Sequence, residues 1–505
     1  MLNGSPHAPA NHAPFILTLD VGTSSVRALL YDAHGQLVPG TGTQEHYQVH
    51  TAADGTNEDN PVVALERIAR CIDTTLAQAG PLAYQIGAVA VATLVSNLLA
   101  IDAHGHPLTP LITYADTRNA EDATTLQHIL DEQEVHQRTG CLLRTSYWPA
   151  RLAWLRRTEP ELWKQTARWL TIGEFLELQL FGVCRVSYSV AAWSGLLHRT
   201  RLVWDAEMLA YLGVDHTQLS PLADFGEPLR GLRGEYAQRW PALQHVPWFP
   251  AIGDGAAANI GSGATGHTRM ALTIGTTGAL RVVQPTVAYV PPGLWCYRVD
   301  RRRALLGGAT SEGGNVYAWL RRTLNLGTPE QIETTLAAMP PDAHGLTVLP
   351  FVAGERSPGW AGDVRATIHG LGTSTTPAEI VRACLEAIAY RFALIEQRLC
   401  DDPTCAHAII GSGGALLSSP AWMQMIADVL NRPLIASEEY EATSRGIALL
   451  ALEALGAMTS IDDLPAADGA TYHPNPERHA IYMAAIARQQ ALYMRFYPHQ
   501  TVGIV

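Results

Sequence analysis

The chain has 505 residues, of which 47% are hydrophobic and 16% are charged, and its formal net charge is -12. This length and composition predict a well-packed globular protein of two or three domains, and the acidic balance gives no indication of a nucleic-acid partner. Lys164 is the only lysine among the 35 basic residues, which excludes a Gly-Lys-Ser/Thr phosphate loop and the strand lysine of protein kinases.

The first segment, residues 1–14, is rich in Ala, Pro, Asn and His and lacks the basic and apolar regions of a signal peptide, so we expect a flexible leader. Seven cysteines without Cys-x-x-Cys spacing indicate reduced thiols. The most apolar stretch, residues 86–101, is short for a membrane span and contains polar residues. These features predict a cytoplasmic protein with no membrane or nucleic-acid partner, and they are compatible with a homodimer.

From residue 15 onward, apolar strand-like runs alternate with amphipathic segments, which predicts an α/β fold. The predicted strands are 15–20, 26–32, 86–93, 98–102, 270–275, 279–284, 304–307, 346–351 and 407–411. The predicted helices are 60–79, 120–138, 148–157, 313–324, 377–400, 420–430, 442–456 and 478–497. The segment 246–251 contains two prolines and marks a predicted boundary between an N-terminal domain (15–249) and a C-terminal domain (250–505).

Two matching turns, residues 20–25 and 275–278, each lie between an apolar run and a returning run. Such a turn directs backbone N–H groups and hydroxyls toward one point, which suits phosphate oxygens. Two copies predict a duplicated domain that holds one nucleotide from both sides. Asp20, at the end of the first strand, could in addition hold Mg²⁺ or its water shell.

Asp254 lies between two glycines shortly before the second turn, so the backbone can bend and expose its carboxylate at a helix start. One interpretation is a general base that accepts a hydroxyl proton during attack on phosphorus, and the other is a helix N-cap. The two phosphate turns favour the base.

Two glycine-rich segments have different contexts. Residues 411–415 follow a predicted strand and precede a helix, which favours an adenosine-binding turn over a plain strand–helix turn. Residues 261–266 match the spacing of a dinucleotide fingerprint, but no strand precedes them and no helix follows, so we predict a loop without a cofactor.

Asp116 and Arg118 follow a short apolar segment in the N-terminal half. They either bind substrate hydroxyls or form a buried pair, and the sequence leaves both interpretations open. The nineteen histidines show no spacing typical of zinc ligands.

With these residues in view, the chain resembles the FGGY family of carbohydrate kinases from about residue 15 to residue 456. Residues 20–27 look like the family's first phosphate motif, with Arg27 where Lys or Arg is usual. Residues 366–386 follow its C-terminal signature except at Cys384. Residues 146–155 are similar to its N-terminal signature, with Arg151 in place of Lys.

The resemblance implies two actin-like, ribonuclease H-like domains of the actin/hexokinase/Hsp70 superfamily, with an interdomain cleft for the sugar. It implies ATP as co-substrate, Asp254 as the catalytic base and Asp20 beside Mg²⁺. The expected nucleotide-binding residues are Thr23, Ser24, Arg27, Gly275, Thr276, Thr277, Gly411, Gly413 and Gly414. The expected substrate-binding residues are Ser96, Asn97, Asp116, Arg118 and Asp254.

The expected substrate is gluconate. Xylulokinases usually carry Gln-Met-His-Gly where this chain has residues 94–97, whereas residues 138–141 and 354–356 look closer to gluconate kinases. Gluconate kinases usually have His-Pro where Leu143-Arg144 stands here, although an additional arginine would suit a carboxylate. Xylulose, another ketose or a polyol is the alternative, and a non-catalytic ATP-binding sugar sensor or chaperone-like protein is the alternative of another class.

Overall fold

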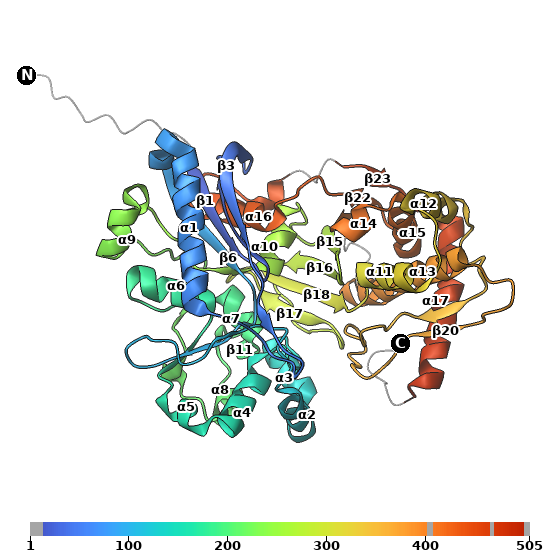
Figure 1. Cartoon of the computed structure of the whole chain (residues 1–505), viewed down its shortest axis with the longest axis horizontal. Helices are drawn as coiled ribbons and strands as arrows, with labels where there is room; N and C mark the ends of the chain where they lie inside the picture. Colours follow the sequence, from blue (N-terminus) through green and yellow to red (C-terminus); the bar gives the residue numbers. More distant parts are fainter. Residues whose placement is uncertain (1–13, 401–407, 465–468, 499–505) are drawn as a thin grey trace, which may run out of the picture.

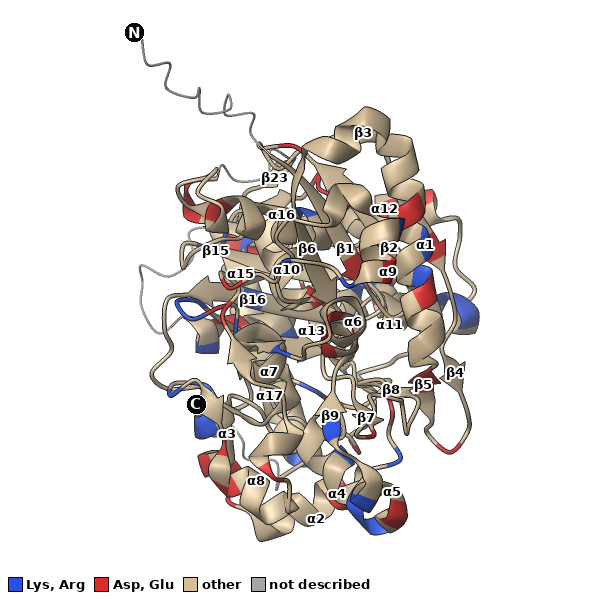
Figure 2. Ribbon diagram, turned by 90° about the vertical axis from the view of Figure 1, so that its left-hand side faces the viewer, with Lys and Arg blue, Asp and Glu red and all other residues tan. Residues whose placement is uncertain are grey.

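The computed structural model describes residues 14–400, 408–464 and 469–498 (Figure 1), so residues 1–13 of the expected leader lie outside the described part of the chain. The structure contains two large sheets, one in each half of the chain. In the view of Figure 2, acidic and basic residues are interspersed along the ribbon. Within the described residues, no helix combines the length and the apolar character needed to cross a membrane.

The first sheet has five strands in the order β14-β6-β1-β2-β3. Their bounds are β1 (Phe15–Val21), β2 (Ser25–Tyr31), β3 (Leu37–His46), β6 (Ile86–Thr93) and β14 (Ile252–Gly253). β1 is antiparallel to β2 and parallel to β6. β1 and β6 are almost continuously apolar and buried, as expected for central strands covered on both faces.

The second sheet repeats this arrangement within a seven-stranded order, β17-β18-β16-β15-β21-β22-β23. Its strands are β15 (Arg269–Ile274), β16 (Gly278–Gln284), β17 (Trp295–Arg298), β18 (Ala304–Thr310), β21 (Ala408–Ser412), β22 (Leu434–Ala436) and β23 (Thr471–Tyr472). β15 is antiparallel to β16 and parallel to β21, as β1 is to β2 and β6. The predicted duplication of a ribonuclease H-like α/β unit is therefore confirmed.

Helices cover both sheets (Figure 1). Those of the first half are α1 (Pro61–Ala79), α2 (Ala120–Ile129), α3 (Glu132–Thr139), α4 (Trp148–Thr158), α5 (Pro160–Gln165), α6 (Ile172–Phe181), α7 (Tyr188–Ser194), α8 (Ala206–Leu212) and α9 (Gly234–Arg239). Those of the second half are α10 (Asp254–Gly261), α11 (Gly314–Thr323), α12 (Pro329–Ala338), α13 (Pro377–Leu399), α14 (Gly414–Leu417), α15 (Pro420–Leu430), α16 (Ala442–Ala454) and α17 (Pro476–Phe496).

Short strands pair outside the two large sheets. They are β4 (His50–Thr51), β5 (Asn57–Asp59), β7 (Leu99–Ile101), β8 (Leu111–Ile112), β9 (Arg168–Leu170), β10 (Val186–Ser187), β11 (Leu197–His198), β12 (Val203–Trp204), β13 (Leu222–Ala223), β19 (Thr347–Leu349) and β20 (Thr367–His369).

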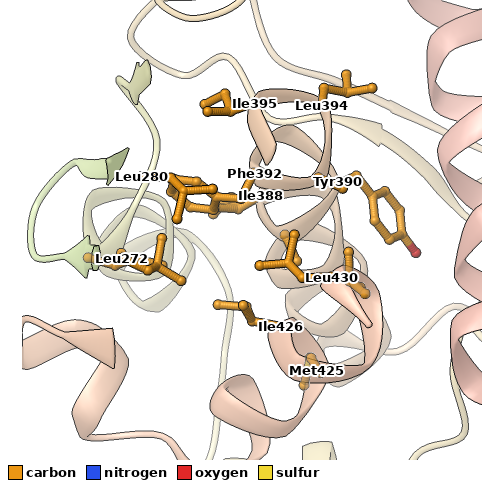
Figure 3. Packing of buried hydrophobic residues seen from close by; sticks show 14 of the residues in the cluster. Leu272, Leu280, Ile388, Tyr390, Phe392, Leu394, Ile395, Met425, Ile426 and Leu430 are labelled. Carbon is orange, nitrogen blue, oxygen red and sulfur yellow. The ribbon is translucent and has the colours of Figure 1, made fainter. Parts of the chain in front are cut away.

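The core of the second half forms around α13 (Figure 3). This helix begins with a capping box, in which the Thr376 hydroxyl and the Glu379 side chain each bond the other residue's backbone N–H. Ile388 and Phe392 on its buried face belong to one apolar cluster with Leu280 of the sheet. Burial of this face fixes the sheet on which the second turn is mounted.

Helices α10 and α16 cross closely at two glycines. A Cβ atom on Gly261 would overlap the carbonyl oxygen of Ala442, and one on Gly446 would overlap that of Ala257. Gly261 therefore serves helix packing. Residues 261–266 begin at the last residue of α10 and precede β15.

Two elements that follow the expected boundary at 249/250 contact the first sheet. β14 pairs with β6 as the edge strand of that sheet. α16 packs on β1 and β6, beside which it lies in Figure 1. The first sheet is thus completed by segments from both halves of the sequence.

One predicted helix is wrong. The segment 120–138 forms two helices, α2 and α3, because the Asp131 side chain accepts hydrogen bonds from the backbone N–H groups of Gln133 and Glu134 and starts a new helix. The predicted strand at 98–102 exists as β7, but it pairs with β9 outside the main sheet.

Candidate functional site

The first turn, between β1 and β2, is held by backbone hydrogen bonds. The Gly22 N–H donates to the Ser25 carbonyl (3.0 Å), and the Tyr47 N–H donates to the Ser24 carbonyl (3.0 Å). Thr23 is partly exposed and Ser24 is exposed. Their side chains are therefore available to a ligand while the backbone keeps its shape.

Asp20 lies at the end of β1, directly opposite Arg27 on β2. The Arg27 Nη1 is 3.2 Å from Asp20 Oδ2, and its Nε is 3.3 Å from Glu441 Oε2, just before α16. Burial and the nearby carboxylate of Asp254 raise the pKa of Asp20 to about 7, although Arg27 opposes the change. The positive charge of Arg27 therefore offsets only part of the rise in the pKa of Asp20.

Asp254 is the first residue of α10, and Gly253 occupies the N-cap position. Its carboxylate accepts a hydrogen bond from the N–H of Gly255 (2.6 Å). Burial raises the pKa of Asp254 to about 6, while that hydrogen bond and Arg281 act in the opposite direction. The helix is thus started by glycine, and the aspartate carboxylate keeps one oxygen for other partners.

Asp254 is close enough to Asp20 that its charge raises the pKa of Asp20. Two carboxylates with incomplete compensation offer the hard oxygen ligands that a divalent cation prefers. The donor set therefore fits Mg²⁺.

The second turn, residues 275–278, forms one surface with the start of α11. The Gly275 N–H donates to the Thr277 carbonyl (3.0 Å), and the Gly314 N–H donates to the Gly275 carbonyl (2.8 Å). Thr276 and Thr277 are exposed. As in the first turn, backbone bonds hold the loop and the hydroxyls are free.

The glycine turn after β21 lies against the second turn. Gly413 has φ 93°, and a Cβ atom there would overlap the backbone of Ile274, so only glycine fits this close approach. Gly414 is exposed. Gly411 is buried inside β21 and packs near Leu434.

A cavity of about 290 Å³ opens beside the start of α11, which is bonded to the second turn. Gly314 and Ala415 lie at its edge and nearly touch each other. The walls come from α11, α12, α13 and α15 and include Tyr317, Leu336, Leu385 and Trp422. Sequence reasoning missed these residues, since apolar positions on helices carry no sign of a ligand.

Ser96 and Asn97, expected at the substrate, are buried and bonded to backbone. The Asn97 amide donates to the Leu94 carbonyl (2.6 Å) and accepts from the Ile172 N–H (2.8 Å). The Ser96 hydroxyl donates to the Trp193 carbonyl (2.6 Å). These bonds satisfy the buried polar groups and fix the loop after β6.

Asp116 and Arg118 form an ion pair in which Asp116 is buried and Arg118 is partly exposed. Asp116 is 1% exposed, and Arg118 Nη2 lies 2.7 Å from its Oδ2 and 3.1 Å from Glu58 Oε2.

An aromatic stack lines the region beside Asp254. The Trp193 Nε1 would be 2.7 Å from a Cβ on Gly253, so the indole lies directly on the residue that precedes the aspartate. Its ring stacks on Tyr297 of β17 at 3.5 Å, and the Tyr297 hydroxyl is 2.5 Å from that of Tyr147. Side chains from both halves of the chain therefore meet here.

Two arginines in the same region have no carboxylate partner within the described part of the chain. Among the described residues, neither Arg281 of β16 nor Arg356 has a side-chain hydrogen bond or an ion pair within 4.0 Å, and the Arg281 Nε is buried without an acceptor. Burial lowers the pKa of Arg281; Asp254 opposes this and Arg356 adds to it. Arg144, by contrast, is paired with Glu132.

Comparison with known proteins agrees with this geometry. Residues 15–261 match the N-terminal domain and residues 270–455 the C-terminal domain of the FGGY family of carbohydrate kinases. A gluconokinase from Bacillus subtilis is 28% identical over 92% of this chain and 92% of its own length.

Two solved structures from Lactobacillus acidophilus superpose with a TM-score of 0.90 at 25% identity. One is a xylulose kinase, and the superposition covers 96% of this chain and 99% of the xylulose kinase chain. The other is a gluconate kinase, and the superposition covers 97% of this chain and 99% of the gluconate kinase chain. The chain belongs to the FGGY family of carbohydrate kinases and is a sugar kinase that uses ATP as co-substrate.

Proposed function

We propose that this kinase transfers the γ-phosphoryl group of ATP to a primary hydroxyl of gluconate. The observation that carries the proposal is the carboxylate of Asp254 at the start of α10, close to Asp20. A base with a pKa near 6 is mostly ionised at neutral pH and still accepts a proton readily.

In the proposed reaction, the adenine occupies the cavity between α11 and α15, and the triphosphate lies along the second turn. Thr276 and Thr277 donate hydrogen bonds to phosphate oxygens, and Thr23 and Ser24 approach from the first turn. The substrate hydroxyl gives its proton to Asp254 as its oxygen bonds to the γ-phosphorus. The bond between that phosphorus and the bridging oxygen breaks, and ADP leaves with the electron pair.

Asp20 would hold Mg²⁺, with Arg27 at its outer side, while Asp254 stays available as the base. When bound, the ion neutralises charge on the β- and γ-phosphates of ATP. Asp20 keeps its position through β1 and its contact with Arg27, so the acidic pair is preorganised before any ligand arrives.

Gluconate is favoured over xylulose by the gluconokinase similarity across the chain. Xylulose is the second candidate, because a xylulose kinase structure superposes equally well. The test is sugar-dependent ADP release with Mg²⁺-ATP for gluconate, D-xylulose, L-ribulose, glycerol and several polyols. We expect gluconate to give the highest kcat/KM. A higher kcat/KM for D-xylulose would show that D-xylulose is the preferred substrate. If no sugar of the panel caused ADP release, the proposed function would be contradicted.

A further inference from the structure

We propose that Arg281 and Arg356 form the receptor for the carboxylate of the substrate, so that the kinase selects sugar acids over neutral sugars of the same length. The inference rests on the proposed function and assigns its substrate preference to two side chains.

Arg281 stands on the face of the second sheet that is turned away from the α13 core. Its neighbours along β16, Leu280 and Val282, are fully buried in that core, so the alternation of the strand places Arg281 on the opposite face. Across the sheet it pairs with Ala271 and Gly307. These small residues offer the guanidinium no side-chain acceptor.

Gly307 is small for a specific reason. A Cβ atom there would crowd the Trp295 ring. Trp295 and Tyr297 belong to the same aromatic stack as Trp193, and Gly307 pairs with both Arg281 and Trp295, so Arg281 stands two strands away from this stack. The arginine is thus part of the wall around the expected acceptor.

Arg356 reaches the same place from the loop after β19. Its guanidinium lies 5.6 Å from the centre of the Trp360 ring. The next residue, Ser357, is bonded to Ala309 of β18: its N–H donates to the Ala309 carbonyl (2.9 Å), and its hydroxyl accepts from the Ala309 N–H (3.1 Å). Arg356 therefore lies beside the strand that pairs with Arg281 at Gly307, and its charge acts on Arg281.

Two guanidinium groups that repel each other and lack a carboxylate partner are costly in a partly buried site. Asp254 does not satisfy them, because no ion pair within 4.0 Å joins it to either arginine. A bound anion would form ion pairs with both arginines, and a planar carboxylate matches the two parallel N–H donors of a guanidinium group. ATP phosphates are the competing anion, so the experiment must separate the two.

The experiment measures binding of gluconate, of D-glucitol and of ATP by calorimetry, which does not depend on turnover. D-glucitol has the same chain length and replaces the carboxylate with a neutral hydroxymethyl group. The proteins are the wild type, Arg281→Gln, Arg356→Gln and the control Arg322→Gln, which removes an exposed charge on α11. Thermal unfolding checks that each variant is folded, and Arg356→Gln provides a loop variant should the sheet variant fail to fold.

We expect the wild type and the control to bind gluconate at least about tenfold more tightly than D-glucitol. Each arginine variant should bind gluconate about ten- to a hundredfold more weakly than the wild type. Its affinities for D-glucitol and ATP should change by less than about threefold. Equal wild-type affinities, an equal loss for both sugars or a loss confined to ATP would overturn the assignment. Selective gluconate binding without ADP release would instead contradict the proposed function and leave the receptor standing.

Discussion

The two strand–turn–strand units share a topology but differ in what surrounds their turns. The β1–β2 turn is bordered by Asp20 and by Arg27, which continues to Glu441. The β15–β16 turn presents Thr276 and Thr277, is docked on the start of α11 and adjoins an apolar cavity. In the proposed function, the first unit manages charge at the reacting phosphate, and the second holds the nucleotide.

The sharpest way to break this comparison is to remove the charge from the first unit. Asp20→Asn should lower kcat by about a hundredfold or more, because a preorganised charge at the reaction site is lost, while ATP affinity changes little. ADP release and calorimetry measure the two quantities. The control Glu235→Gln removes an exposed carboxylate on α9 and should leave both unchanged. A normal kcat in Asp20→Asn would contradict the role of the first unit.

The second unit is tested by filling its turn. Thr276→Leu should weaken ATP binding by about tenfold, since a hydroxyl donor is replaced by a bulky apolar group, and gluconate affinity should stay the same. Thr23→Leu makes the same replacement in the first turn and should weaken ATP binding less than Thr276→Leu does. Equal losses at the two turns would show that the units do not divide the work in this way.

The pH dependence of kcat/KM sharpens the assignment of the base. Because Asp254 must be ionised to accept a proton, kcat/KM should fall as the pH drops through about 6. Arg281 lowers the pKa of Asp254, so Arg281→Gln should move this acid limb to higher pH. An acid limb near pH 4, or a shift in the opposite direction, would contradict the assignment.

The smallest expected effect concerns stability. The folded state raises the pKa of Asp254 from 3.8 to about 6, so this group favours folding below about pH 4 and loses that contribution as the pH rises through about 6. Asp254→Asn removes the buried charge and should raise the free energy of unfolding at pH 8 by about 1 kcal/mol or more. Thermal unfolding at pH 8 and pH 4 measures it; a lower Tm of the variant at pH 8 would contradict this reasoning.

The sequence predicted the strand pairs, both turns and the carboxylates beside them, because these follow from local alternation, glycine content and position at strand ends. It did not predict that Asn97 bonds to backbone on both sides of its amide, since that depends on the distant Ile172. Nor did it single out Arg281 or Trp193. Each becomes informative only when the sheet face and the stacking partners are known.

The break between α2 and α3 illustrates the same limit. The segment is helical on both sides, and only the hydrogen bonds of Asp131 reveal that it starts a second helix. The ion pairs of Arg118 likewise depend on tertiary structure, because Glu58 lies far from it in the sequence.

The most direct test of the account compares the wild type with Asp254→Asn in gluconate-dependent ADP release and in ATP binding. The account predicts that the wild type releases ADP when gluconate is added. The variant should bind ATP within about threefold of the wild type and transfer phosphate at least about a thousandfold more slowly. Transfer by Asp254→Asn at a rate close to that of the wild type would contradict the claim that Asp254 is the base.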